Sequence, residues 1–177
     1  MVLAAEQRGV ARGMAGGAGL SLAVLGAGAL LPPIALPASE AMADRLSFVL
    51  RADLVLIFWL VAAIASVAKD RFFSPHDIAG SGFNEPTPKI AIGRAIVQNT
   101  HEQVTIAVGA HLALATVLPM RFMGFIPILV LLFCIGRAAF WFGYAGGAAS
   151  RAFGFETTFF PTVIAALLAA ALALSQW

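Results

Sequence analysis

Arg94-Ala-Ile-Val-Gln-Asn99-Thr-His-Glu102-Gln opens a long apolar run that continues to Leu118. Asn99 and Glu102 are three residues apart, so they share one face if the stretch is helical. An ionisable Glu inside a membrane-spanning helix is costly, and by default it indicates a functional site with a partner elsewhere. The fold should therefore bring a second polar group to this face.

The composition is that of a membrane protein. Of the 177 residues, 60% are hydrophobic and 11% are charged, whereas about a quarter of the residues of a soluble domain are charged. We expect an all-α, multi-pass integral membrane protein in a lipid bilayer, located in a bacterial inner membrane. The net charge of +2 comes from few groups, and no nucleic-acid partner is expected. Cys134 is the only cysteine, so no disulfide can form within the chain.

Five apolar runs are long enough to be considered as membrane spans, at about residues 14–36, 46–68, 91–118, 122–148 and 157–174. The N-terminal part, residues 1–43, has two interpretations: an extra transmembrane helix or a signal-like segment that ends near Ala41-Met42-Ala43. Gly9, Gly13 and Gly17 recur at every fourth residue, a spacing that lets helices approach closely. Residues 44–177 are expected to form the main membrane domain.

Basic residues near the ends of the runs predict the orientation, because cytoplasmic loops concentrate Lys and Arg. With five spans, the polar loop 69–92 and the N-terminus share one side, which we expect to be cytoplasmic. Trp177 would then be an interface anchor on the opposite side. The predicted cytoplasmic side holds Arg8, Arg12, Lys69, Arg71, Lys89, Arg94 and Arg151, and the opposite side holds Arg45, Arg51 and Arg121.

A second polar set consists of Arg137, Tyr144 and Arg151, which are spaced by seven and seven residues. Seven steps return to nearly the same face of a helix, with a drift of about 20°, so the three form one stripe if the helix continues that far. An unpaired Arg in the bilayer costs at least about 3 kcal/mol. The expected partner of Arg137 is Glu102, which lies at similar depth on the preceding, antiparallel run. That pair is either part of a binding site or a purely structural contact between helices.

These side chains suit a small zwitterion that carries more negative than positive groups. Arg137, Arg151 and Arg94 offer cationic forks for carboxylates. Glu102 can accept an ammonium, and Asn99 and Tyr144 can hydrogen-bond.

Two further polar features lie outside this set. No metal site is expected, because His101 and His111 lie ten residues apart, without the spacing of a helical ligand pair. Asp53 is expected either as an interfacial charge near a helix end or as a partner of Arg121.

From about residue 46 to its end the chain resembles the MAPEG family, membrane-associated proteins in eicosanoid and glutathione metabolism. The second helix of that family carries Arg-Ala-x-x-Asn-x-x-Glu, and its third helix ends in an Arg…Gly-Tyr…Arg pattern. Asn99-x-x-Glu102 matches the end of the first motif, and Arg137, Gly143-Tyr144 and Arg151 match the second.

The sequence departs from the family pattern in three places. Arg94 stands five residues before Asn99, where the family's arginine stands four before. Phe140 stands where some catalytic members have a tyrosine. The N-terminal apolar segment is additional.

The resemblance implies a homotrimer of MAPEG-like four-helix bundles, here with an additional N-terminal hydrophobic helix. It implies that glutathione binds as a co-substrate between neighbouring subunits near the cytoplasmic face, and that Arg151 is the catalytic residue that stabilises its thiolate. The expected glutathione-binding residues are Asn99, Glu102, Arg137, Tyr144, Arg94, Lys69 and Arg71.

The implied function is that of a glutathione transferase or peroxidase acting on lipophilic electrophiles. A non-catalytic structural subunit of a larger membrane complex is the alternative. A carrier for a small anion is less favoured, because only one polar cluster and no inverted repeat are present.

Overall fold

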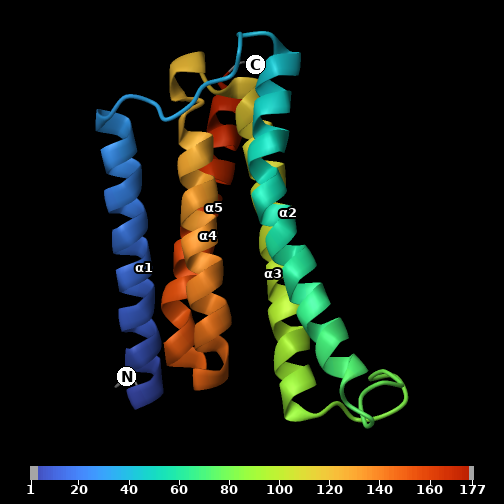
Figure 1. Ribbon diagram of the computed structural model, residues 1–177. Helices are drawn as coiled ribbons and strands as arrows, with labels where there is room; N and C mark the ends of the chain where they lie inside the picture. Colours follow the sequence, from blue (N-terminus) through green and yellow to red (C-terminus); the bar gives the residue numbers. More distant parts are fainter. Residues whose placement is uncertain (1–3, 176–177) are drawn as a thin grey trace.

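The computed structural model describes residues 4–175, and within them five long helices alternate in direction (Figure 1). The predicted all-α fold with an additional N-terminal helix is confirmed, whereas Trp177 lies outside the described residues. The long helices are α1 (Ala5–Leu30), α2 (Met42–Phe72), α3 (Pro88–Val117), α4 (Phe125–Gly143) and α5 (Ala148–Leu174), with short 3-10 turns η1 (Met120–Phe122) and η2 (Tyr144–Gly146).

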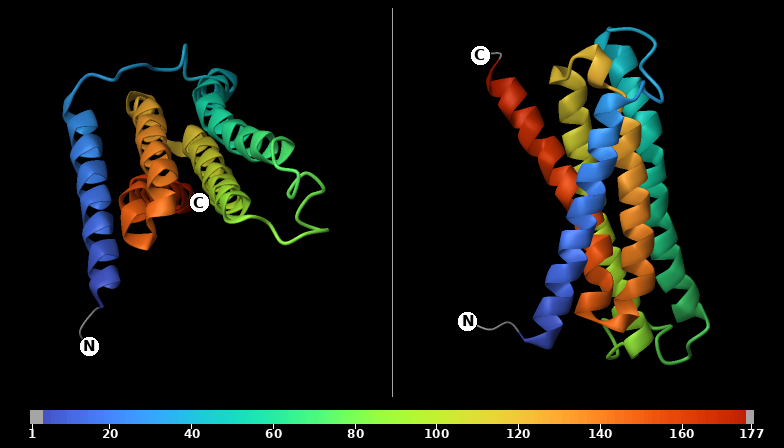
Figure 2. Two further views of the ribbon diagram at one scale, coloured as in Figure 1. Left: turned by 60° about the horizontal axis from the view of Figure 1, so that its bottom comes forward. Right: turned by 90° about the vertical axis from the view of Figure 1, so that its left-hand side faces the viewer.

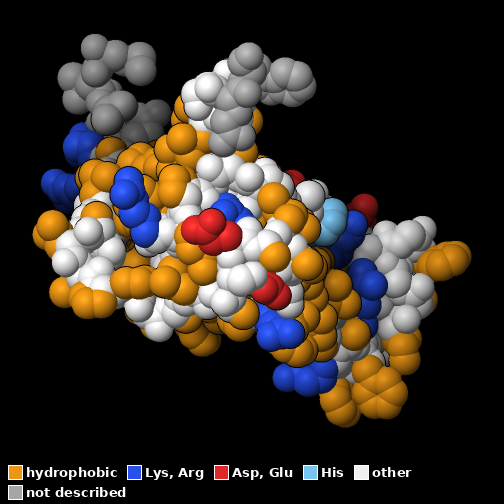
Figure 3. Space-filling model, turned by 90° about the horizontal axis from the view of Figure 1, so that it is seen from above, with side chains coloured by type: hydrophobic (Ala, Val, Ile, Leu, Met, Phe, Trp, Pro, Cys, Tyr) orange, Lys and Arg blue, Asp and Glu red, His pale blue; other side chains and the backbone are white. Residues whose placement is uncertain are grey.

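Four segments of the described chain are long and apolar enough to cross a bilayer: α1, α2, α4 with its flanking turns, and α5. α3 is also 30 residues long and lies against α2 and α5, but the polar motif lowers its hydropathy. The protein is therefore a multi-pass membrane protein. Viewed from above, hydrophobic side chains cover much of the visible surface, and charged ones form separate spots (Figure 3).

α5 is the central helix of the bundle, because it packs against α1, α3 and α4. The two ends of the described chain lie at opposite ends of the bundle, which is the arrangement expected for five crossings (Figure 1). α5 leans away from the other helices toward its C-terminal end (Figure 2). Pro161 lies inside this helix, where it removes one backbone donor and crowds the preceding turn.

The glycine row of α1 faces α5. A Cβ atom on Gly13 would lie 2.9 Å from the Cβ of Ala152, and one on Gly17 would lie 2.8 Å from the carbonyl oxygen of Phe153. A side chain at either position would collide with α5, so glycine is what allows the two helices to touch. The close helix packing predicted from the glycine spacing is confirmed.

The break between α4 and α5 differs from the prediction. The sequence suggested one run over 122–148 and a turn near Arg151, but α4 ends at Gly143 and α5 begins at Ala148. Gly147 has φ 92°, a conformation that favours glycine, and it reverses the chain there. The Arg137–Tyr144–Arg151 stripe on one helix is therefore wrong, and Arg151 lies in the first turn of α5.

Buried polar contacts join the N-terminal part of α2 to the C-terminal part of α3. Arg45 donates from Nε to the Ala115 carbonyl oxygen at 2.7 Å and from Nη2 to that of Leu118, which satisfies carbonyls at the end of α3. Asp53 Oδ1 accepts a hydrogen bond from His111 Nδ1 at 2.7 Å, and both side chains are buried.

The alternative that paired Asp53 with Arg121 is wrong. Asp53 lies about three turns inside α2, whereas Arg121 lies in the exposed turn η1 with its guanidinium over the Phe122 ring at 4.7 Å. The two side chains therefore lie at different depths.

Candidate functional site

Arg137 lies at the centre of the candidate site and is only 1% exposed. Its Nη1 donates to Asn99 Oδ1 at 2.8 Å, and its Nε donates to Thr158 Oγ1 at 3.2 Å. The third nitrogen, Nη2, is buried and has no hydrogen-bond partner. One guanidinium thus links α4 to α3 and α5 through neutral groups alone.

A close crossing of α4 and α5 places Thr158 next to this guanidinium. A Cβ on Gly136 would lie 2.7 Å from the Thr158 backbone nitrogen and 2.9 Å from the Gly154 carbonyl oxygen. Thr158 Oγ1 also donates to that carbonyl at 2.9 Å. We did not predict Thr158 from the sequence; the signal was the small pair Gly154-x-x-x-Thr158, a spacing typical of close contacts between membrane helices.

Aromatic rings extend the site from Arg137 to α5. The Arg137 guanidinium lies 4.3 Å from the centre of the Phe140 ring, and Phe140 meets the Tyr144 ring edge-on at 5.3 Å. The Arg151 guanidinium lies 4.4 Å from the centre of the Tyr144 ring. Such cation–π contacts fix the position of a guanidinium without neutralising it. Asn99, Arg137, Tyr144 and Arg151 are therefore brought into one connected set.

Glu102 does not belong to this set within a single chain. Its side chain is exposed and accepts a hydrogen bond from Gln98 Nε2 at 2.8 Å. Within residues 4–175 no carboxylate forms an ion pair with Arg137, so the predicted Glu102–Arg137 pair is wrong for the isolated chain. Asn99 and Glu102 differ by about 60° around α3; Asn99 faces α4, and Glu102 faces the open side.

The open side of α3 is polar along much of its length. Arg94, Gln98, Glu102 and Thr105 follow one another at spacings of four, four and three residues, and all four are exposed. Polar and charged side chains on a spanning helix face protein or a water-filled space rather than hydrocarbon. This face of α3 therefore requires a cover that one copy of the chain does not supply.

The remaining predicted residues lie at the end of α2 that faces the long loop. Lys69 is exposed, whereas Arg71 donates from Nη2 to Ser81 Oγ of that loop at 2.9 Å. Neither side chain reaches Arg137 by a contact within the described chain, but both lie at the same end of the bundle as Arg94 and Arg151 (Figure 1). In residues 4–175 no group of three or more His, Cys, Asp and Glu side chains has the arrangement of a metal site.

Asp77 holds the loop between α2 and α3 in its shape. Its carboxylate accepts from the Thr87 backbone N–H at 2.9 Å, from the Thr87 hydroxyl at 2.8 Å and from the Ser74 hydroxyl at 2.7 Å. The Thr87 backbone hydrogen bond is the main reason that the pKa of Asp77 lies below its ordinary value, while burial opposes the shift. The long polar loop thus has a defined shape, and it lies at the same end of the bundle as the start of α5 (Figure 1).

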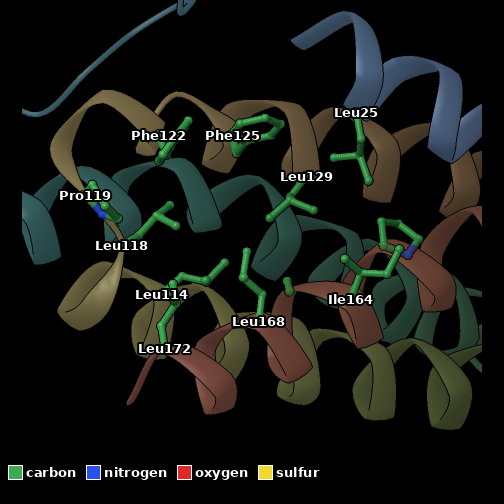
Figure 4. Close-up of a pocket in the computed structure, with 12 residues that line it drawn as sticks. Leu25, Leu114, Leu118, Pro119, Phe122, Phe125, Leu129, Ile164, Leu168 and Leu172 are labelled. Atoms are coloured by element: carbon green, nitrogen blue, oxygen red, sulfur yellow. The ribbon is translucent and has the colours of Figure 1, made fainter. Parts of the chain in front are cut away.

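A cavity of about 390 Å³ lies at the opposite end of the bundle, between α1, α3, α4 and α5 (Figure 4). All of its lining side chains are apolar, among them Leu25, Phe125 and Leu168. Such a cavity has no group that could hold a charged guest. The chemistry of the molecule is therefore concentrated at the Arg137–Arg151 end.

Comparison with known proteins identifies a family. The model of the MAPEG family matches residues 46–171. This range includes α3 and α4 and most of α2 and α5, and it leaves α1 outside. No solved structure matches the chain.

Two similar curated proteins are both called "Transmembrane protein 79". The one from Mus musculus is 31% identical over 137 residues, which cover 77% of this chain and 34% of the mouse protein. The one from Bos taurus is 30% identical over 136 residues, covering 77% and 33%. The chain thus spans about a third of the length of these relatives. Because both are mammalian, they give no support to the predicted bacterial inner membrane.

Proposed function

The chain belongs to the MAPEG family, and from that premise we propose that it binds glutathione and attaches it, through its sulfur, to lipophilic electrophiles. Glutathione would lie between copies of the chain, along the polar face of α3 and next to Arg137. The apolar acceptor would arrive from the bilayer. The copies would form a homotrimer, as the family resemblance implies.

Arg137 is the observation that carries this proposal. The Arg137 guanidinium is 1% exposed at membrane depth, and its hydrogen-bond partners Asn99 and Thr158 are neutral, so its charge is uncompensated. Breaking or omitting one partner of a buried charge is costly, at about 3–5 kcal/mol. Glutathione carries two carboxylates and one ammonium, so it can supply the missing negative charge and leave its ammonium for Glu102.

Arg151 would stabilise the sulfur of glutathione rather than bind its carboxylates. A nearby cation favours the thiolate over the thiol, and the thiolate is the nucleophile. The Tyr144 ring holds the Arg151 guanidinium in place at 4.4 Å. With 1-chloro-2,4-dinitrobenzene as acceptor, the sulfur forms a bond to the ring carbon, the carbon–chlorine bond breaks, and chloride leaves with the electron pair.

Phe140 favours a second candidate function, that of a non-catalytic subunit of a larger membrane complex. Where some catalytic members of the family have a tyrosine, this chain has a ring without a hydroxyl, and that ring lies under the Arg137 guanidinium. In this alternative the only role of Arg137 and Phe140 would be to stabilise the helix bundle.

Isothermal calorimetry and turnover of the purified full-length chain separate the two functions. We expect the wild type to bind glutathione and Arg151→Ala to lose about a hundredfold in conjugation rate, with the residual rate rising with pH as the thiol ionises unaided. Arg121→Ala is the matched control, because Arg121 also lies over an aromatic ring but at the other end of the bundle. A wild type that binds no glutathione would overturn the proposal.

A further inference from the structure

A cleft of about 260 Å³ lies beside Arg151 and is built from three helices. Within residues 4–175, Arg151 is the only charged side chain in the lining, so the cleft combines one cation with an apolar wall. The lining consists of Val10 and Met14 from α1, Phe140 from α4, and Ala148, Arg151, Ala152 and Phe155 from α5.

Two of these residues come from outside the family domain. The MAPEG model begins at residue 46, so Val10 and Met14 belong to a helix that the four-helix domain does not include. Without α1, the cleft would lose one wall and open to the bilayer. The Arg151 end of this chain therefore has a boundary that its family domain does not provide.

The α1 side of the cleft has a fixed position, because the backbones of α1 and α5 are in close contact. A Cβ on Gly9 would lie 2.8 Å from the Ala149 Cβ, and one on Gly13 would lie 3.0 Å from the Phe153 backbone nitrogen. Met14 follows Gly13 directly and remains 41% exposed, so its side chain stands at the edge of the cleft rather than inside the helix contact. A flexible thioether at such an edge adapts to apolar ligands.

We propose that Val10 and Met14 form the apolar wall of the acceptor subsite, and that α1 thereby selects electrophiles by the length of their hydrocarbon chain. This inference rests on the proposed glutathione chemistry at Arg151. The acceptor class is a 2-alkenal or a similar lipophilic enone. The thiolate sulfur adds to the β-carbon, the electrons of the carbon–carbon double bond move to the α-carbon, and the α-carbon takes a proton from water.

The first experiment compares two 2-alkenals that share one reacting centre, crotonaldehyde and 2-nonenal, with the full chain in lipid nanodiscs. We expect Met14→Ala to lower the ratio of kcat/KM for 2-nonenal to that for crotonaldehyde about tenfold, a difference typical of lost apolar contacts in a binding pocket. Glutathione binding should stay unchanged by calorimetry. Leu22→Ala, an exposed position of α1 that does not line the cleft, is the control and should leave the ratio unchanged.

A second measurement tests the cleft without turnover. A photoreactive diazirine analogue of nonanal should label the segments around Met14 and Phe155, and excess nonanal should compete for that labelling. Two outcomes would overturn the inference about α1 and leave the proposed function standing. In both, glutathione binding is normal. In the first, Met14→Ala leaves the ratio of the two kcat/KM values unchanged, and in the second, the cleft takes up no saturable label. A labelled cleft in a protein that binds no glutathione would overturn the proposed function and, with it, the role of α1 in conjugation.

Discussion

Asp53 and His111 show how single residues tie membrane helices together. The pair joins α2 to α3 at 2.7 Å, both side chains are at most 2% exposed, and Asp53 Oδ2 has no hydrogen-bond partner. A buried carboxylate in an apolar bundle is tolerated only with a partner, and its cost rises sharply when that partner is removed. His111 therefore stabilises the bundle as the hydrogen-bond partner of Asp53.

We predict that His111→Leu lowers the free energy of unfolding by about 3–5 kcal/mol, because it leaves the Asp53 carboxylate buried without a donor. Titration with denaturing detergent in micelles measures this change. The double variant Asp53→Leu/His111→Leu should lose less than the sum of the two single variants, since it removes both polar groups. Strict additivity would show that the two residues do not stabilise each other.

At this same scale the sequence identified the residue types of the candidate site but not their directions. Asn99 and Glu102 belong to one motif, yet Asn99 contacts Arg137 and Glu102 is exposed. The helical repeat specifies the angle between the two residues and leaves open how α3 is rotated against its neighbours. Thr158 was missed for a related reason: its place beside Arg137 depends on the approach of α5 to Gly136, which no local pattern of α4 reveals.

Among the elements, the helices were predicted well and their ends less well. Apolar runs located all five, because about 20 apolar residues are needed to cross the bilayer and few other structures use such runs. The end of α4 at Gly143 was missed, since the apolar composition continues through the 3-10 turn Tyr144–Gly146 and up to Gly147, where the positive φ reverses the chain. The polar loop predicted over 69–92 is shorter in the structure, because α2 continues to Phe72 and α3 begins at Pro88. Asp77 organises the turns between the two helices.

The loop should loosen in acid. The lowered pKa of Asp77 means that its contribution to loop stability is present above the ordinary carboxyl value of 3.8 and is lost as the pH falls through the lower, folded value. A spin label on Ile78→Cys, an exposed loop position, in a Cys134→Ser background should become mobile only as the pH falls below the ordinary carboxyl value of 3.8. In Asp77→Asn the label should be mobile throughout; an unchanged acid response in that variant would contradict the assignment.

For the whole molecule, two exposed helix faces have opposite chemistry. The exposed face of α2 carries Leu50, Leu54 and Phe58, which suit hydrocarbon. The exposed face of α3 carries Gln98, Glu102 and Thr105, which do not. Closed symmetric assemblies bury such a face between copies of the chain. The proposed glutathione site needs that closure, because Glu102 is otherwise left at the open side.

We therefore predict that α3, and not α2, lies between copies. In a Cys134→Ser background, Thr105→Cys should form covalent dimers on oxidation in a bilayer, whereas Leu54→Cys on the apolar face of α2 should not. The mass in nanodiscs, after subtraction of the lipid and scaffold, should be three times 18.4 kDa. A mass of one chain, together with no cross-link at residue 105, would leave a charged helix face against lipid, and the site proposed between subunits would have to be abandoned.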